Sequence, residues 1–97
     1  MISTHVLDTE SGAPARGVRV ELYRDGDLLA ADETNDDGRI PELSPQALET
    51  GEYRLVFHPP SAFFRRVELT VAVDDTARHY HVPLLFSSYS CASYRGS

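Results

Sequence analysis

The 97 residues suffice for one domain with one core, because two independent cores would each be too small to fold alone. A hydrophobic share of 41% argues against disorder, and a net charge of −6 disfavours nucleic acid and anionic membrane surfaces as partners. No stretch approaches the ~18 apolar residues that a membrane helix needs, and the single cysteine, Cys91, excludes a disulfide within the chain. With no signal peptide visible, we expect one domain over residues 1–97 in the cytoplasm.

Short runs that alternate between apolar and polar residues predict β-strands along the whole chain. Glycine, proline and Asx residues separate these runs, and the pair Asp25-Gly26 is typical of a tight hairpin turn. A single helical turn is expected over residues 45–49, because Ser44 can cap its N-terminus. In chain order, the expected strands cover residues 2–8, 17–24, 28–33, 39–43, 51–58, 66–73, 78–86 and 89–94.

Eight short strands separated by turns at intervals of about 8–12 residues are typical of a β-sandwich or barrel. The clearest strand lies at residues 66–73. Its inward side chains are expected to be Val67, Leu69, Val71 and Val73. The fold class is therefore predicted to be all-β, with at most one short helix.

Two histidines lie two positions apart near the end of the chain, so in a strand His79 and His81 project from the same face. The opposite face carries Tyr80 and the better core residues, which are Val82, Leu84 and Phe86. The two histidines are therefore expected to face outward, either as ordinary surface residues or as part of a site at an interface. A zinc site would need a third ligand, which His5 could supply, but a His-x-His pair on a strand is a weak signal for metal.

Arg39 follows the tight turn Asp37-Gly38, which fixes where its side chain starts. It is either a solvated loop arginine or a planar cation that binds a carbonyl or an anion through paired hydrogen bonds. The segment at residues 94–97, YRGS, places an aromatic ring, a cation and a hydroxyl directly after a strand. Chain ends usually fray unless they are bound. Composition and spacing by themselves thus indicate an all-β protein with a candidate His/Arg site.

The chain contains three separated motifs: STHVLDTESGAPA (residues 3–15), TNDDGR (34–39) and HYHVPLLFSSYSCASYRGS (79–97). Together they resemble motifs of the transthyretin-like family, and within it those of the 5-hydroxyisourate hydrolases, for which the YRGS ending is the specific part. The resemblance covers essentially the whole chain. It implies an eight-stranded sandwich of two four-stranded sheets, assembled as a homotetramer, a dimer of dimers with its sites between dimers.

The same resemblance implies an enzyme that hydrolyses a small molecule, 5-hydroxyisourate, to 2-oxo-4-hydroxy-4-carboxy-5-ureidoimidazoline in urate degradation, with no cofactor and no metal. The implied catalytic residues are His5, Arg39, His81 and Ser97, and the implied substrate-binding residues are His5, Arg39 and Tyr94. His79 lies two positions before the family histidine and is left out of the set. His81 is favoured as the general base, because histidine titrates near neutral pH, but the sequence leaves open which histidine has this role.

Two other functions compete with hydrolysis. A transthyretin-type carrier would bind hydrophobic small molecules without chemistry, but the polar residues of the three motifs argue against apolar channel walls. A secreted or periplasmic interaction module would carry a signal peptide, and none is visible. The segment after Phe57 is also shorter than usual in the family, which leaves little room for the short helix found there.

Overall fold

Ten strands form in the computed structural model, which describes residues 1–44 and 47–96. In chain order they are β1 (Ile2–Asp8), β2 (Ala13–Pro14), β3 (Arg19–Arg24), β4 (Asp27–Glu33), β5 (Arg39–Ile40), β6 (Gly51–His58), β7 (Val67–Val73), β8 (Tyr80–His81), β9 (Leu84–Phe86) and β10 (Cys91–Ser93). The described residues contain no helix, and hence none long and apolar enough to cross a membrane. The predicted all-β class is confirmed.

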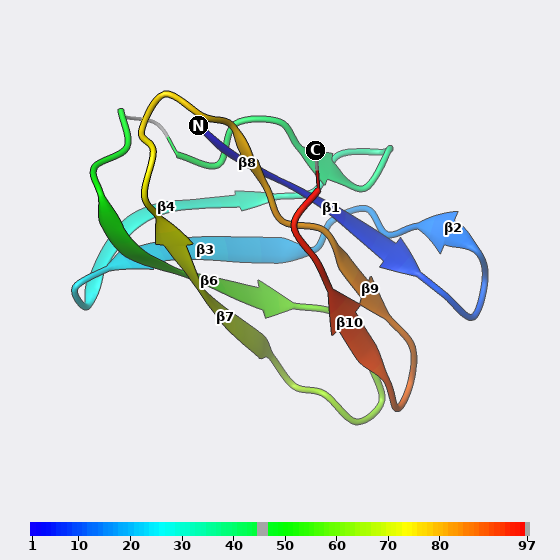
Figure 1. Ribbon diagram of the computed structural model, residues 1–97. Helices are drawn as coiled ribbons and strands as arrows, with labels where there is room; N and C mark the ends of the chain where they lie inside the picture. The colour runs from blue at the N-terminus through cyan, green and yellow to red at the C-terminus, as the bar shows by residue number, and fades with distance from the viewer. Residues whose placement is uncertain (45–46, 97) are drawn as a thin grey trace.

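The strands form two sheets that pack against each other (Figure 1). One sheet has the order β4-β3-β6-β7, and its pairs are all antiparallel. In the other sheet β1 is central: it pairs with β2 and β5 antiparallel and with β8 and β9 parallel, and β10 extends the sheet beyond β9. Because β1 pairs with four other strands, its outward side chains lie at the centre of that sheet's outer face.

The core lies between the sheets and is built from the inward residues of the alternating runs. Its fully buried side chains include Val20, Leu22, Leu55 and Phe57 from one sheet and Ile2, Val6 and Leu84 from the other. Burial of a side chain of this kind contributes about 1.5–3 kcal/mol. The two inward rows therefore hold the sheets together and fix which residues must point outward.

The predicted strand at residues 78–86 is divided into β8 and β9. Pro83 lies between them, and because proline has no N–H to donate, the ladder cannot run through it. The predicted core residues Val82, Leu84 and Phe86 are nevertheless buried, and so is Tyr80 on the same face. The short β2 falls where the sequence predicts a loop. Counting β8 and β9 as one interrupted strand, and leaving β2 aside, gives the eight strands that the sequence predicts.

Several boundaries differ from the predicted ones. β5 and β10 are shorter than the predicted strands 39–43 and 89–94, because each keeps ladder pairing over only part of its run. Residues 45 and 46 of the predicted helical turn lie outside the described residues, and residues 47–49 are not helical. The connection between β6 and β7, residues 59–66, also contains no helix.

Candidate active site

The outward face of β1 carries Ser3 and His5, because residues two apart on a strand point to the same side. The intervening Thr4 points into the core and is 1% exposed. The register of strand pairing then decides which residues join this face. Arg39 on β5 lies opposite His5, and His81 on β8 lies opposite Ser3. Strand pairing thus gathers four polar side chains from three strands.

The turn before β5 fixes the backbone of Arg39. The side-chain oxygen of Asn35 accepts hydrogen bonds from the amides of Asp37 and Arg39, both at 3.0 Å. Gly38 has a φ of +74°, and a Cβ at this position would lie 2.6 Å from the carbonyl oxygen of Val6. Only glycine fits there without strain and collision. The glycine of the TNDDGR motif therefore lets the turn approach β1 closely and presents Arg39 beside His5.

A serine hydroxyl connects two histidines of the site. Ser3 Oγ lies 2.6 Å from Nε2 of His79 and 2.8 Å from Nδ1 of His81. Ser3 is only 6% exposed, whereas His81 is half-buried and His79 is exposed. Since Nδ1 of His81 is occupied by this bond, its Nε2 is the ring atom left for proton transfer with a bound molecule.

An open cavity of about 310 Å³ lies beside these side chains. Its lining residues are Ser3, Thr4, Arg39, Pro41, His79 and His81. The volume is at the lower end of the range for small-molecule sites, which is about 300–1,000 Å³. His5 lies opposite Arg39 on the same face, next to this cavity rather than among its lining residues.

The surroundings of His81 lower its pKa below the ordinary histidine value. Desolvation is the largest cause, since partial burial disfavours the charged imidazolium, and electrostatic repulsion from Arg39, followed by His5 and His79, acts in the same direction. His81 is therefore neutral at pH 7 and able to accept a proton. Arg39 remains cationic at that pH and can stabilise negative charge that develops in the cavity.

The C-terminal motif packs against β8. The Gly96 amide donates a hydrogen bond to the His81 carbonyl oxygen at 2.8 Å, and the Arg95 guanidinium lies 4.6 Å from the centre of the Tyr80 ring. A Cβ on Gly96 would collide with Cδ2 of the His81 ring. In Figure 1 the red C-terminal segment accordingly runs back beside the orange segment of β8 and β9. The motif's glycine thus permits a contact that helps to hold His81, while Ser97 lies outside the described residues.

The structure brings together three of the predicted residues, His5, Arg39 and His81, but places Tyr94 elsewhere. Tyr94 is 59% exposed and belongs to a separate cavity of about 330 Å³ between β7 and the C-terminal segment. Ser3, which joins the site, is absent from the residues predicted from the sequence. The available signal was the alternation at residues 3–5, which puts Ser3 on the face of His5.

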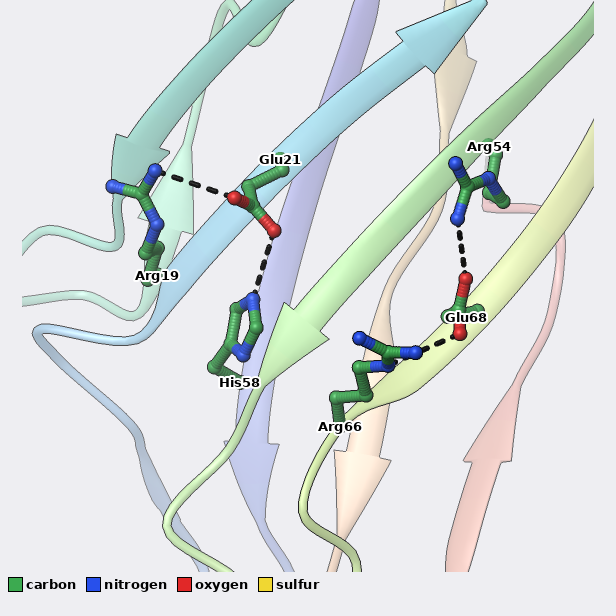
Figure 2. Close-up of polar contacts among 6 residues, drawn as sticks. All are labelled: Arg19, Glu21, Arg54, His58, Arg66 and Glu68. Atoms are coloured by element: carbon green, nitrogen blue, oxygen red, sulfur yellow. Dashed lines mark hydrogen bonds and ion pairs between the residues drawn. The ribbon is translucent and has the colours of Figure 1, made fainter. Parts of the chain in front are cut away.

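The fourth histidine belongs to a polar cluster on the outer face of the other sheet. His58 Nε2 lies 2.9 Å from the Glu21 carboxyl, which also accepts a hydrogen bond from Arg19 at 3.3 Å (Figure 2). The hydrogen bond from His58 is the largest cause that lowers the pKa of Glu21. The neighbouring cluster around Glu68 likewise pairs opposite charges (Figure 2). These groups satisfy one another and lie on the sheet opposite the His/Arg cavity.

Metal binding was one possible use of the histidines. Among residues 1–44 and 47–96, no three His, Cys, Asp or Glu side chains are grouped so that they could hold a metal ion.

A two-sheet sandwich with imidazoles and a guanidinium beside an open cavity, on the outer face of its β1 sheet, is the arrangement of a transthyretin-type domain with a candidate site on that face. A family model described as the HIUase/Transthyretin family matches residues 2–96. The chain belongs to this family, as the three motifs predict.

Similar proteins include 5-hydroxyisourate hydrolases and a transthyretin. The chain is 42% identical to 5-hydroxyisourate hydrolase 2 of Rhizobium meliloti (strain 1021) over 114 aligned positions, which cover 99% of this chain and 95% of the relative. It superposes on a Klebsiella pneumoniae 5-hydroxyisourate hydrolase with a TM-score of 0.91 and 36% identity, covering 99% and 98% of the two chains. A sea bream transthyretin in complex with thyroxine gives a TM-score of 0.84 at 24% identity, with coverages of 98% and 93%, and shows the fold alone.

The alignment with the Rhizobium relative also bears on the length of the chain. Its 114 positions against 97 residues leave at least 17 positions at which the relative has residues that this chain lacks. The Rhizobium relative therefore contains residues, within the aligned region, that have no counterpart in this chain.

Proposed function

We propose that this chain is an enzyme that hydrolyses 5-hydroxyisourate to 2-oxo-4-hydroxy-4-carboxy-5-ureidoimidazoline. The observation that carries the proposal is the joint presence of a neutral His81 and a cationic Arg39 in one open cavity, with His5 beside them. The relatives named as 5-hydroxyisourate hydrolases support the same reaction, since they align with essentially the whole chain.

The reaction opens a six-membered ring by cleavage of an amide-type bond. For this the protein must supply a base, a cation and an acid. A base must take a proton from the attacking water, and His81 is placed for this role through its Nε2. A cation must stabilise the oxyanion that forms on the attacked carbonyl, and Arg39 supplies it without any proton transfer. An acid must return a proton to the ring nitrogen as the bond breaks. Positioned acid–base catalysis of this kind contributes about 10²–10⁴-fold.

His5 and two residues of the YRGS motif complete the proposed site. His5 lies opposite Arg39 and is suited to orient the substrate or to share the proton. Tyr94 is proposed as a substrate contact and Ser97 as a group that orients the water. Because Tyr94 is exposed on its own chain, this assignment requires a site completed by another subunit.

We therefore propose a homotetramer, a dimer of dimers, with sites between dimers. Large aromatic side chains are exposed on the single chain, and contacts between subunits would cover them. They include Phe63 at 64%, Tyr89 at 76% and Tyr94 at 59% exposure. Multi-angle light scattering of the purified protein should give four times the mass of one chain. A monomer with full activity would contradict this assembly.

A cytoplasmic location is also proposed, as a single domain over residues 1–97. Cys91 is the only cysteine, so the fold does not depend on an oxidising compartment. Its thiol is half-buried, and this burial raises its pKa, so the reactive thiolate is scarce at neutral pH.

A carrier of hydrophobic small molecules is the alternative function. The cavity argues against it, because Arg39, His79 and His81 place a guanidinium and two imidazoles beside it. The similar protein that binds thyroxine shares only the fold, whereas the relatives with higher identity carry hydrolase names.

The test uses substrate formed in the cuvette from urate and urate oxidase. Decay of the 5-hydroxyisourate absorbance should accelerate in proportion to the amount of purified protein added. Decay at the spontaneous rate would overturn the proposed activity and leave the carrier as the better reading.

A further inference from the structure

Ser3 makes two hydrogen bonds that must share a single hydroxyl proton. Its Oγ contacts Nε2 of His79 at 2.6 Å and Nδ1 of His81 at 2.8 Å. A hydroxyl donates one hydrogen bond and accepts up to two. If Ser3 donates to one histidine, the other histidine must therefore donate its own N–H to Ser3.

This constraint couples the protonation of the two rings. When His79 carries the proton on Nε2, Ser3 donates to Nδ1 of His81, and neutral His81 must carry its own proton on Nε2. When His81 carries the proton on Nδ1, Ser3 donates to Nε2 of His79, and Nε2 of His81 is a free base. The first arrangement makes His81 an acid toward the cavity, and the second makes it a base.

We infer that His79 is a positioning residue that acts through Ser3 to set, and to exchange, the protonation state of His81. The inference rests on the proposed hydrolysis for its role in turnover. It assigns a function to a histidine that lines the cavity and that the catalytic set leaves out.

The proton transfers of one turnover balance along this path. Nε2 of His81 takes a proton from the attacking water, and its Nδ1–H passes a proton to Ser3 Oγ while the Ser3 hydroxyl proton passes to Nε2 of His79. The positive charge then rests on His79, and neutral His81 carries a proton on Nε2 that it can give to the leaving ring nitrogen. When His79 returns its proton through Ser3 to Nδ1 of His81, the starting arrangement is restored.

The surroundings favour movement of the charge in this direction. The groups that face His81 are Arg39 from β5, His5 from β1 and His79 from its own segment. Arg39 is always cationic and disfavours an imidazolium at His81, and partial burial of His81 acts in the same direction. His79 is exposed, so water can solvate a charge there. Ser3, in contrast, is buried and its backbone is fixed, because its carbonyl oxygen accepts the Val82 amide at 2.9 Å.

The test replaces each member of the path with a residue that keeps the shape. His79→Gln retains a side-chain amide that can bond to Ser3 but cannot relay a proton, and Ser3→Ala removes both bonds. We expect each variant to lower kcat at least about tenfold with KM within about twofold of wild type, since acid–base steps contribute about 10²–10⁴-fold. Ser3→Thr keeps the hydroxyl and should restore most of the rate. His58→Gln, at a histidine on the opposite sheet, is the matched control and should leave kcat unchanged.

Two further readouts separate proton relay from a merely structural role. In mixtures of H₂O and D₂O, kcat of the wild type should depend on the deuterium fraction along a curve, because several protons move together, whereas His79→Gln should give a straight line. Nitrogen-15 NMR of the histidine rings, recorded without substrate, should show the Nδ1 and Nε2 shifts of His81 changing in His79→Gln and Ser3→Ala but not in His58→Gln.

The outcomes distinguish this inference from the proposed function. If the wild type does not accelerate substrate decay, the hydrolysis fails, and the NMR shifts alone decide whether His79 controls the protonation of His81. If His79→Gln leaves the His81 shifts unchanged, the inference is overturned, whatever the activity. In an active enzyme, a His79→Gln variant with the wild-type kcat and the same curved isotope dependence also overturns it.

Discussion

The close contact between Gly96 and His81 allows the site to be perturbed without replacing any of its reacting side chains. In Gly96→Ala, the added Cβ would collide with Cδ2 of the His81 ring and lie 3.1 Å from its Cγ. Either the C-terminal segment moves away or the ring rotates. The first route loses the Gly96–His81 hydrogen bond, worth about 0.5–1.5 kcal/mol, and the second costs a similar amount for a ring held about 30° off its rotamer.

The effect on activity should be much larger than the effect on stability. A misplacement of about 1 Å at a reacting group can cost about 10²-fold in rate. We therefore expect kcat/KM for 5-hydroxyisourate to fall by about two orders of magnitude, while the free energy of unfolding falls by no more than about 1.5 kcal/mol. Substrate decay in the urate oxidase assay and denaturant unfolding measure the two quantities.

A matched control is Gly26→Ala in the β3–β4 turn. Gly26 has a φ of +83°, but no atom lies within 4 Å of a Cβ placed on it, so this variant suffers backbone strain without a collision. It should lose about 1 kcal/mol of stability and retain its activity. The reasoning would be refuted if Gly96→Ala kept the wild-type kcat/KM, or if both variants lost activity equally.

Two further predictions concern the charge at His81 and the core. An NMR titration should give His81 a pKa below the ordinary value of about 6.5, and Arg39→Gln should raise it, because one of the cations that disfavour the imidazolium is removed. Since the neutral form accepts the proton, kcat/KM should fall on the acidic side of its pH profile with an apparent pKa below that of an ordinary histidine. An apparent pKa above about 6.5 would contradict the placement of His81. Leu55→Ala should lower the free energy of unfolding by about 2–5 kcal/mol, because Leu55 is fully buried on β6, and a loss below 1 kcal/mol in urea unfolding would show that the two-sheet core is packed differently.

The fold was largely predictable because the apolar residues of the alternating runs are the ones that the structure buries. Residues such as Leu22 and Leu55 lie in runs whose period of two identifies the inward face, and the structure buries them fully. The break between β8 and β9 is less apparent, since the apolar period continues through Pro83 although the hydrogen-bond ladder does not. The ends of the strands depend on which backbone groups form hydrogen bonds, and the alternation of apolar and polar side chains does not show this.

Three residues of the candidate site were predictable from the sequence, but their arrangement was not. His5, Arg39 and His81 each belong to a recognisable motif, but only the registers of β1 with β5 and β8 bring them together. The bridge from Ser3 to His79 has no local signal, because its partners are 76 positions apart in the chain. The position of Tyr94, exposed and away from the His/Arg cavity, likewise has no local signal, because it follows from how the C-terminal segment packs beside β7.

The most direct test of the account compares the initial rate of 5-hydroxyisourate loss for wild type and His81→Ala at equal protein concentrations. The backbone bonds of His81 do not need its side chain, so the variant should fold, as circular dichroism can verify. The wild type should exceed the spontaneous rate in proportion to its concentration, and removal of the imidazole should lower that excess by at least about 10²-fold. Two equal rates would contradict the claim that this cavity catalyses the hydrolysis.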